Sequence, residues 1–214
     1  MEKIRILCYG DSNTWGYISG SDHQRYGITE RWPKVLASLL GDDFEIIEEG
    51  LNSRTLTTYD PRPEKRGTNG YDYLIPCLDT HDPVDLVILM LGTNELKVAY
   101  NNTANEIGEM LENYFVKTIL NRKSQIKDSY PKLLIITPPI LNEIKDYPPE
   151  DNNFLGALEK SQKLNDIYRS IAEKYDCYFL GNEGLETGID GVHITKESHQ
   201  KLAEKVKEKI KSIY

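Results

Sequence analysis

The sequence has few of the residues on which disulfide-bonded and metal-binding proteins depend. Only three of its 214 residues are cysteines, and Cys8, Cys77 and Cys177 form no C-x-x-C pair. Three scattered thiols are too few for a disulfide framework or a zinc site, so we expect buried thiols in a reducing compartment. No H-E-x-x-H or comparable ligand spacing occurs. The sequence therefore predicts neither a metal nor another cofactor.

Long apolar runs are also missing. No run approaches the ~18 apolar residues that a membrane helix needs. The apolar stretch that follows Met1 is far too short for the core of a signal peptide. These absences predict a soluble, cytoplasmic protein with no membrane partner.

The sequence has fewer basic than acidic residues. Lys and Arg number 26 against 34 Asp and Glu, which gives a formal net charge of -8. A surface of this sign opposes binding to phosphates, so we expect no nucleic-acid partner. The lysine-rich segment 195–212 is diluted by Glu197, Glu204 and Glu208. It therefore favours a solvated helix face over a membrane-surface patch.

The apolar residues that are present alternate between short β-rich runs and longer helical periods. This alternation is typical of an α/β protein with a mainly parallel sheet, and the length favours one domain over residues 1–214. The expected strands are Ile4–Tyr9, Phe44–Glu48, Val84–Leu91, Lys132–Thr137 and Cys177–Leu180. The expected helices span residues 31–41, 71–80, 104–126, 156–175 and 195–212. Long irregular segments at Tyr17–Glu30, Thr57–Asn69 and Pro138–Phe154 are expected to be functional or interfacial.

Small polar side chains gather at the ends of the expected strands. In open parallel sheets the ligand site forms outside the carboxyl ends of the strands, so these residues are expected to meet. The four segments are Gly10-Asp11-Ser12, Gly50–Thr55, Gly92-Thr93-Asn94-Glu95 and Asp190-Gly191-Val192-His193. Together they offer a hydroxyl, an amide, a carboxylate and an imidazole.

That set of groups is what acyl transfer requires. Ser12 lies at a strand-to-helix turn, where its hydroxyl is exposed and its own N–H can bind an oxyanion. A nucleophilic serine needs a base, and the base needs a group that holds its tautomer. Asp190 and His193 are three residues apart and can lie on the same side of one turn. Asn94 adds a side-chain donor for the oxyanion. Glycine-rich phosphate loops and a phosphoaspartate motif do not fit Gly10-Asp11-Ser12.

These blocks, in this order, resemble those of the SGNH (GDSL-type) hydrolase family. The segments Glu48–Thr55 and Asp85–Lys97 are similar to its bacterial arylesterase/acyltransferase branch. The resemblance implies a flavodoxin-like, three-layer α/β/α fold with a five-stranded parallel sheet. It also implies Ser12 as nucleophile, His193 as base and Asp190 as the group that orients the base.

The resemblance further implies an oxyanion hole made by Ser12, Ser53 and Asn94. Ser53 stands where the family has a glycine, and only its N–H is needed. The third block ends in Glu95 instead of aspartate, which concerns loop packing more than catalysis. Asp11 is expected to stabilise the turn that carries the nucleophile. Gly92 is expected to lie close behind the groups that touch the substrate.

Several nearby residues have two readings. Trp15 and Tyr17 either wall the substrate pocket or belong to the core. Arg54 either clamps an acidic substrate or pairs with Asp60, Glu48 or Glu95. His23 and His81 are expected to be surface or structural residues, and His199 a helix-surface residue.

The sequence favours a serine esterase that hydrolyses short-chain acyl esters of small molecules and also transfers the acyl group to alcohols. A carbohydrate O-acetyl esterase is the alternative, because the segments Tyr17–Glu30 and Thr57–Asn69 are polar and aromatic. A non-catalytic binding domain is the remote alternative, because the chain keeps every catalytic group. The Pro-rich loops and the resemblance predict a homo-oligomer in which neighbouring subunits narrow the pocket entrance.

Overall fold

The computed structural model describes residues 2–142 and 153–214, and its centre is one parallel sheet. The order across the sheet is β2-β1-β3-β4-β5, and every neighbouring pair is parallel. The strands are β1 (Ile4–Gly10), β2 (Phe44–Gly50), β3 (Leu86–Met90), β4 (Lys132–Ile136) and β5 (Tyr178–Leu180). Each lies at the run predicted for it.

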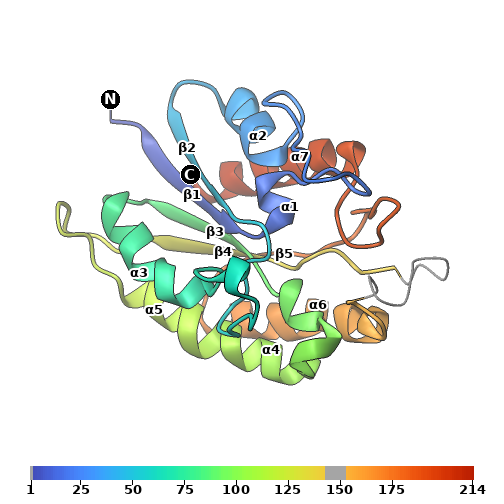
Figure 1. Cartoon of the computed structure of the whole chain (residues 1–214). Coiled ribbons are helices and arrows are strands. Elements are labelled where there is room, and N and C mark those ends of the chain that lie inside the picture. The colour runs from blue at the N-terminus through green and yellow to red at the C-terminus, as the bar shows by residue number, and fades with distance from the viewer. Residues whose placement is uncertain (1, 143–152) are drawn as a thin grey trace.

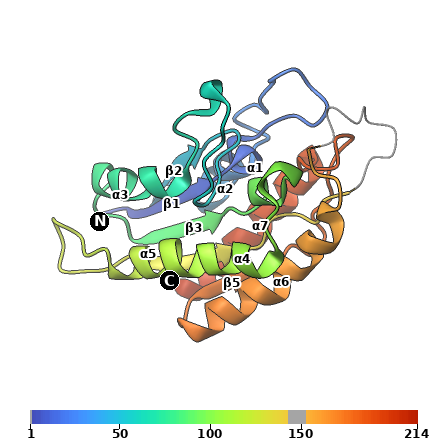
Figure 2. The same cartoon turned by 60° about the horizontal axis from the view of Figure 1, so that its bottom comes forward.

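Helices cover both faces of this sheet (Figures 1 and 2). One face carries α2 (Trp32–Leu40) and α7 (Lys196–Ile213). The other carries α3 (Gly70–Thr80), α4 (Ala104–Met110), α5 (Lys117–Asn121) and α6 (Ala157–Lys174). The predicted three-layer α/β/α fold is thereby confirmed. In the described ranges, no helix combines the length and apolar character that a bilayer crossing requires.

The helix expected over residues 104–126 is shorter and less regular than predicted. From α4 the chain passes through a π-helical segment, Leu111–Val116, into α5, which ends at Asn121. Arg122 already has extended backbone, and its guanidinium forms an ion pair with Asp79 of α3. The end predicted at residue 126 is therefore wrong.

Alternate side chains of each strand enter different halves of the core. In β1, Leu7 and Tyr9 join the cluster under α3–α6, whereas Ile6 and Cys8 join the cluster under α2 and α7. All five residues of β3 are buried because both of its faces are covered. Because all neighbouring strands are parallel, their carboxyl ends meet at one edge of this buried sheet.

The part of the core under α2 and α7 contains a histidine, His199, that is predicted from the sequence to lie on the surface. His199 is fully buried in α7, and its Nδ1 accepts a hydrogen bond from the Trp32 N–H at 3.2 Å. It lies three and seven residues before Leu202 and Val206, which are also buried, so all three share one helix face. Burial, with the charge of His193, lowers the pKa of His199 to about 3. The surface assignment of His199 is wrong.

A short helix, α1 (Ser12–Trp15), begins at the strand-to-helix turn expected at Ser12 and lies directly against the end of β2. A Cβ added to Gly50 would overlap the backbone N of Trp15, and a Cβ on Gly10 would lie 2.9 Å from the Met90 carbonyl oxygen. Both neighbours are backbone atoms, which cannot rotate away as a side chain can. Glycine at these two strand ends lets the turn that carries Ser12 pack directly against the sheet.

We therefore expect Gly50→Ala to destabilise the protein by about 1–3 kcal/mol, the usual cost of overpacking a tight site. Urea denaturation measures the free energy of unfolding. Gly27→Ala is the matched control, because the nearest atom to its added Cβ is the mobile carboxylate of Glu30 at 3.2 Å. Equal unfolding free energies for the two variants would contradict the close approach of α1 to β2.

Candidate active site

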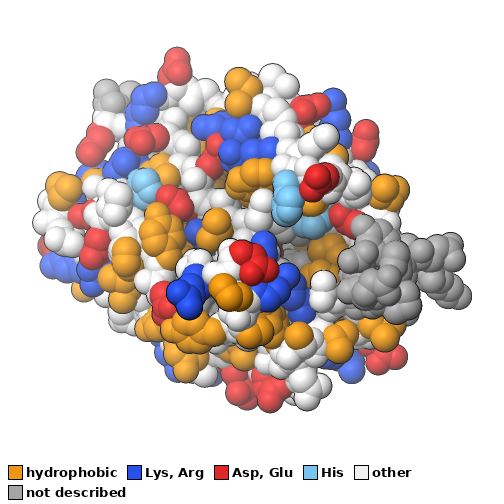
Figure 3. Space-filling model, in the orientation of Figure 1, with side chains coloured by type: hydrophobic (Ala, Val, Ile, Leu, Met, Phe, Trp, Pro, Cys, Tyr) orange, Lys and Arg blue, Asp and Glu red, His pale blue; other side chains and the backbone are white. Residues whose placement is uncertain are grey.

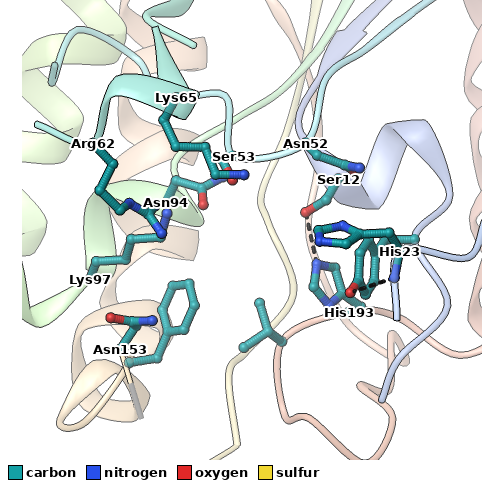
Figure 4. Close-up of a pocket in the computed structure, with 13 residues that line it drawn as sticks. Ser12, His23, Asn52, Ser53, Arg62, Lys65, Asn94, Lys97, Asn153 and His193 are labelled. Atoms are coloured by element: carbon teal, nitrogen blue, oxygen red, sulfur yellow. Dashed lines mark hydrogen bonds between the residues drawn. The ribbon is translucent and has the colours of Figure 1, made fainter. Parts of the chain in front are cut away.

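Ser12 is the first residue of α1, at the carboxyl end of β1. Asp11 caps this helix, and its carboxylate accepts a hydrogen bond from the Asn13 N–H at 2.9 Å. The turn is thereby braced from the buried side. The Ser12 hydroxyl lies 2.9 Å from Nε2 of His193, which comes from the segment before α7 (Figure 4).

The ring of His193 is held on its other side by Asp190. Nδ1 of His193 lies 2.7 Å from Oδ2 of Asp190. The second carboxylate oxygen accepts hydrogen bonds from the N–H groups of Val192 and His193, both at 2.9 Å. Burial alone would raise the pKa of Asp190, but the hydrogen bonds and the charge of His193 outweigh it and hold that pKa well below its usual range. Asp190 is therefore ionised and fixes the imidazole.

Asn13 joins the two ends of the chain at this point. Its side-chain oxygen accepts a hydrogen bond from the Ile194 N–H at 2.9 Å, and its amide nitrogen donates to the Val192 carbonyl at 3.4 Å. Both partners flank His193. Asn13, which we did not single out from the sequence, thus sets the position of His193 relative to Ser12.

The groups predicted for the oxyanion hole line the same pocket as Ser12. Ser53 has φ of +64°, the left-handed region in which a side chain is disfavoured. This conformation explains why a glycine suits the position. The Asn94 amide donates one hydrogen to the Arg54 carbonyl at 3.0 Å, which leaves its second hydrogen for a ligand.

The pocket has a volume of about 200 Å³, which suits a small acyl group better than a drug-sized ligand. Ser12, His193 and His23 lie on one side of it, and Ser53 and Asn94 on the other (Figure 4). The space-filling view shows the hollow between His side chains and a group of Lys and Arg side chains (Figure 3). Tyr17 lines the pocket as predicted, with its ring stacked on that of His193 at 4.3 Å.

Trp15 and Arg54, for which a place in the pocket was one of two readings, lie elsewhere. Among the residues that the structure describes, the pocket lining includes neither Trp15 nor Arg54. Trp15 packs under the Arg25 guanidinium at 4.9 Å. Arg54 is buried beneath the pocket, where it donates to the Gly10 carbonyl at 3.0 Å and its guanidinium lies 3.9 Å from the Glu49 carboxylate. The pocket role of both, and the pairing of Arg54 with Asp60, Glu48 or Glu95, are wrong.

The pocket also contains residues to which the sequence analysis gave no site role. They are His23, Asn52, Arg62, Lys65, Lys97, Asn153, Phe154 and Val192. Three of them, His23, Arg62 and Lys65, lie in the irregular segments Tyr17–Glu30 and Thr57–Asn69. The length of these segments indicated a functional role, because long loops often carry binding residues. Part of the third segment, residues 143–152, lies outside the described residues.

Glu95 and Gly92 lie behind the pocket. Glu95 is fully buried, and its carboxyl accepts a hydrogen bond from the Leu56 N–H, which links the third block to the second. Burial raises the pKa of Glu95 to about 8. Gly92 has φ of +121°, and a Cβ there would collide with the Tyr168 hydroxyl.

One group of side chains has the composition of a metal site. Ligand atoms of Glu49, Cys77 and His81 all lie within 4.8 Å of one another. These residues are not in the described lining of the Ser12 pocket, and Nε2 of His81 lies 2.9 Å from Oε1 of Glu49 in a hydrogen bond. The expectation that no metal takes part stays a prediction.

The chain is similar to known proteins in both sequence and fold. The model of the GDSL-like Lipase/Acylhydrolase family matches residues 8–201. A carbohydrate acetylesterase from Sinorhizobium meliloti, Est24, is 35% identical over 99% of this chain and 100% of its own, with a TM-score of 0.92. The native aryl esterase of M. smegmatis is 35% identical over 98% and 99% of the two chains, with a TM-score of 0.89. No match was found among curated proteins.

The raised pKa of Glu95 predicts how stability changes with pH. The folded protein keeps the proton up to a pH of about 8, whereas the unfolded chain releases it near pH 4.5. The folded state therefore binds more protons between these values, and the free energy of unfolding falls as pH rises, by up to about 1.4 kcal/mol per pH unit. We expect Glu95→Gln to lack this fall, so that its stability relative to wild type grows from pH 5 to 8.

Urea denaturation at a series of pH values measures this difference. Glu109→Gln on α4 is the control, because Glu109 is exposed and its substitution should leave the pH profile of the wild type unchanged. Parallel profiles for wild type and Glu95→Gln would show that Glu95 is ionised in the folded protein.

Proposed function

The chain belongs to the GDSL-like lipase/acylhydrolase family and is a carboxylic ester hydrolase, and we propose that Ser12, His193 and Asp190 carry out its reaction. The observation that supports this most directly is the continuous chain of hydrogen bonds from Asp190 through His193 to Ser12, at 2.7 and 2.9 Å, which ends in the pocket. This is the arrangement of an activated serine nucleophile.

In the first half-reaction, Ser12 Oγ attacks the ester carbonyl carbon while His193 Nε2 takes the hydroxyl proton. The carbonyl π electrons move to the oxygen, and the N–H groups of Ser12 and Ser53 and the Asn94 amide bind the resulting oxyanion. When the oxyanion collapses, the C–O bond to the alcohol breaks and His193 gives its proton to the leaving oxygen. The products are a free alcohol and an acyl group on Ser12.

In the second half-reaction, a water molecule takes the place of the alcohol. His193 accepts a proton from the water, whose oxygen attacks the acyl carbon, and the Ser12 oxygen then leaves with that proton. Asp190 remains ionised throughout and stabilises the imidazolium. If an alcohol enters instead of water, the same steps give a new ester. This transfer belongs to the proposal.

Short acyl esters are the proposed substrates because the pocket is only about 200 Å³. Acetylated carbohydrates are the second candidate. Est24, a carbohydrate acetylesterase, is as similar in sequence to this chain as the aryl esterase is. In addition, the pocket rim carries polar and aromatic residues such as Asn52, Asn153 and Tyr17.

A homo-oligomer is also part of the proposal. Val98, Leu155 and Ile189 expose 50, 63 and 73% of their surface. They lie next in the chain to residues that shape the site, because Val98 follows Lys97, Leu155 follows Phe154 and Ile189 precedes Asp190. Exposed apolar side chains next to site residues suit cover by a second copy of the chain. We place the enzyme in the cytoplasm, because Cys8, Cys77 and Cys177 are all free.

We expect Ser12→Ala to hydrolyse p-nitrophenyl acetate at least about 1000-fold more slowly than the wild type, because the nucleophile is gone. A fluorophosphonate probe should label the wild type and not Ser12→Ala. Asn94→Ala should lose about 100- to 1000-fold in rate through the missing oxyanion donor, yet still be labelled slowly. The same proteins assayed with acetylated xylo-oligosaccharides distinguish the two substrate classes.

Equal rates for wild type and Ser12→Ala would disprove the mechanism. A folded wild type that the probe does not label would favour a non-catalytic binding domain instead. Much faster acetate release from the oligosaccharide than from the aryl ester would favour the carbohydrate esterase.

For the assembly, we expect light scattering of the purified protein to give a multiple of the 24.6 kDa chain mass. Ile189→Lys should shift the mass toward the monomer, because it places a charge in the proposed contact. Ile126→Lys is the control, since Ile126 is 71% exposed in the loop after α5 and far along the chain from the site residues. A monomeric wild type would remove the oligomer from the proposal.

A further inference from the structure

The pocket that holds Ser12 has a wall of cations. Arg62 and Lys65 come from the segment Thr57–Asn69, and Lys97 follows the third block. In Figure 4 the three side chains lie across the pocket from Ser12 and His193. In a chain with a net charge of -8, three cations at one pocket are a local reversal of sign.

The acidic groups nearby neutralise this wall only in part. Asp60, whose side chain is 1% exposed, forms two side-chain hydrogen bonds with Arg62, at 2.8 and 2.6 Å. The Tyr100 hydroxyl donates to the same carboxylate at 2.8 Å. Asp60 is therefore fully engaged by Arg62 and Tyr100. Within residues 2–142 and 153–214, neither Lys65 nor Lys97 has an ion pair.

Lys97 is the more deeply buried of the two lysines. It is 8% exposed, and its ammonium lies 5.7 Å from the centre of the Tyr100 ring. Burial, followed by the charge of Arg62, lowers its pKa to about 8. Glu95, which is also near, keeps its own proton at neutral pH because its pKa is about 8. A buried cation without a full counter-ion is costly, and an anion in the pocket would supply what is missing.

We propose that the site prefers esters whose acyl part ends in a carboxylate, which Lys65 and Lys97 bind. Short monoesters of dicarboxylic acids have this chemistry. The proposal rests on the proposed esterase function of the same pocket. It adds a substrate class that the small pocket volume alone does not specify.

The positions of the reacting groups determine which part of the ester carries the charge. The leaving oxygen must lie beside His193 Nε2, which gives it a proton. The oxyanion must lie beside Ser53 and Asn94. The remaining substituent of the carbonyl carbon is the acyl chain, and the side of the pocket away from His193 carries Lys65 and Lys97 (Figure 4). A carboxylate on the acyl chain is therefore the one that reaches the cations.

The test compares kcat/KM for monoethyl succinate with that for ethyl succinamate, in which a neutral amide replaces the carboxylate at nearly the same size. We expect the wild type to favour the charged ester by at least about tenfold, the gain of one charge-assisted hydrogen bond. Glycolate O-acetate and its amide form a second pair with the charge on the alcohol side, for which we expect no such preference. Ser12→Ala measures the background rate of every ester.

Variants assign the preference to residues. Lys65→Gln and Lys97→Gln should each lower the charged-to-neutral ratio about tenfold. Lys65 is only partly buried, so its variant is informative even if Lys97→Gln disturbs folding. Arg66→Gln is the matched control: it removes one cation from the same loop at an exposed position outside the described pocket lining, and the ratio should stay unchanged. Added salt should lower the ratio of the wild type, because ions screen a partly exposed charge.

A ratio near one for the succinate pair, with ethyl succinamate hydrolysed and Ser12 labelled, would overturn the charge preference and leave the esterase function standing. A preference for the charged ester only in the glycolate pair would overturn the acyl assignment. A protein that hydrolyses none of the four esters and is not labelled would instead disprove the proposed function.

Discussion

The site depends on the hydrogen bonds by which Asn13 holds the segment around His193. Ser12 and His193 are 181 residues apart in the sequence. Ser12 directly follows β1 near the start of the chain, whereas His193 lies just before α7, the last helix. The Asn13 amide bonds to Val192 and Ile194, the two residues that flank His193. Because Asn13 is the direct neighbour of Ser12, the two bonds set the distance between Ser12 and His193. The 2.9 Å contact between Ser12 and His193 follows from this link.

The carboxyl ends of the strands were predictable because they depend on hydrophobic pattern and topology alone. Apolar runs gave the strands, parallel order brought their ends to one edge, and Ser12, Asn94 and His193 follow at or after those ends. His199 was predictable by the same rule, since it lies at helical spacing from Leu202 and Val206. Membership of a lysine-rich helix favours the surface for a histidine, whereas this spacing favours burial, and the structure follows the spacing.

The site residues that could not be predicted lie in irregular segments. No regular spacing of apolar residues there indicates in which direction a side chain points. Lys65 is the last residue of a short 3-10 helix, Pro63–Lys65, and its side chain reaches the pocket only because of the local backbone path. Arg54 is adjacent to Ser53 in the chain but points to the other side, under the pocket. Successive residues of a tight turn face different ways, so a site residue does not imply that its neighbour is one.

Arg54 then explains how the proposed oxyanion donors, Ser12, Ser53 and Asn94, are held relative to one another. Its guanidinium bonds to the carbonyls of Gly10 and Glu49 at the ends of β1 and β2, and its own carbonyl accepts a hydrogen bond from Asn94. The ring of Tyr9 lies 4.1 Å from the guanidinium carbon and completes the packing. One buried cation thus joins the ends of β1 and β2, the Ser53 loop and the Asn94 loop. The Glu49 carboxylate, 3.9 Å from the guanidinium, and the backbone carbonyls balance the charge of Arg54. Among the described pocket-lining cations, the ones without an ion pair are therefore Lys65 and Lys97, on the wall opposite Ser12.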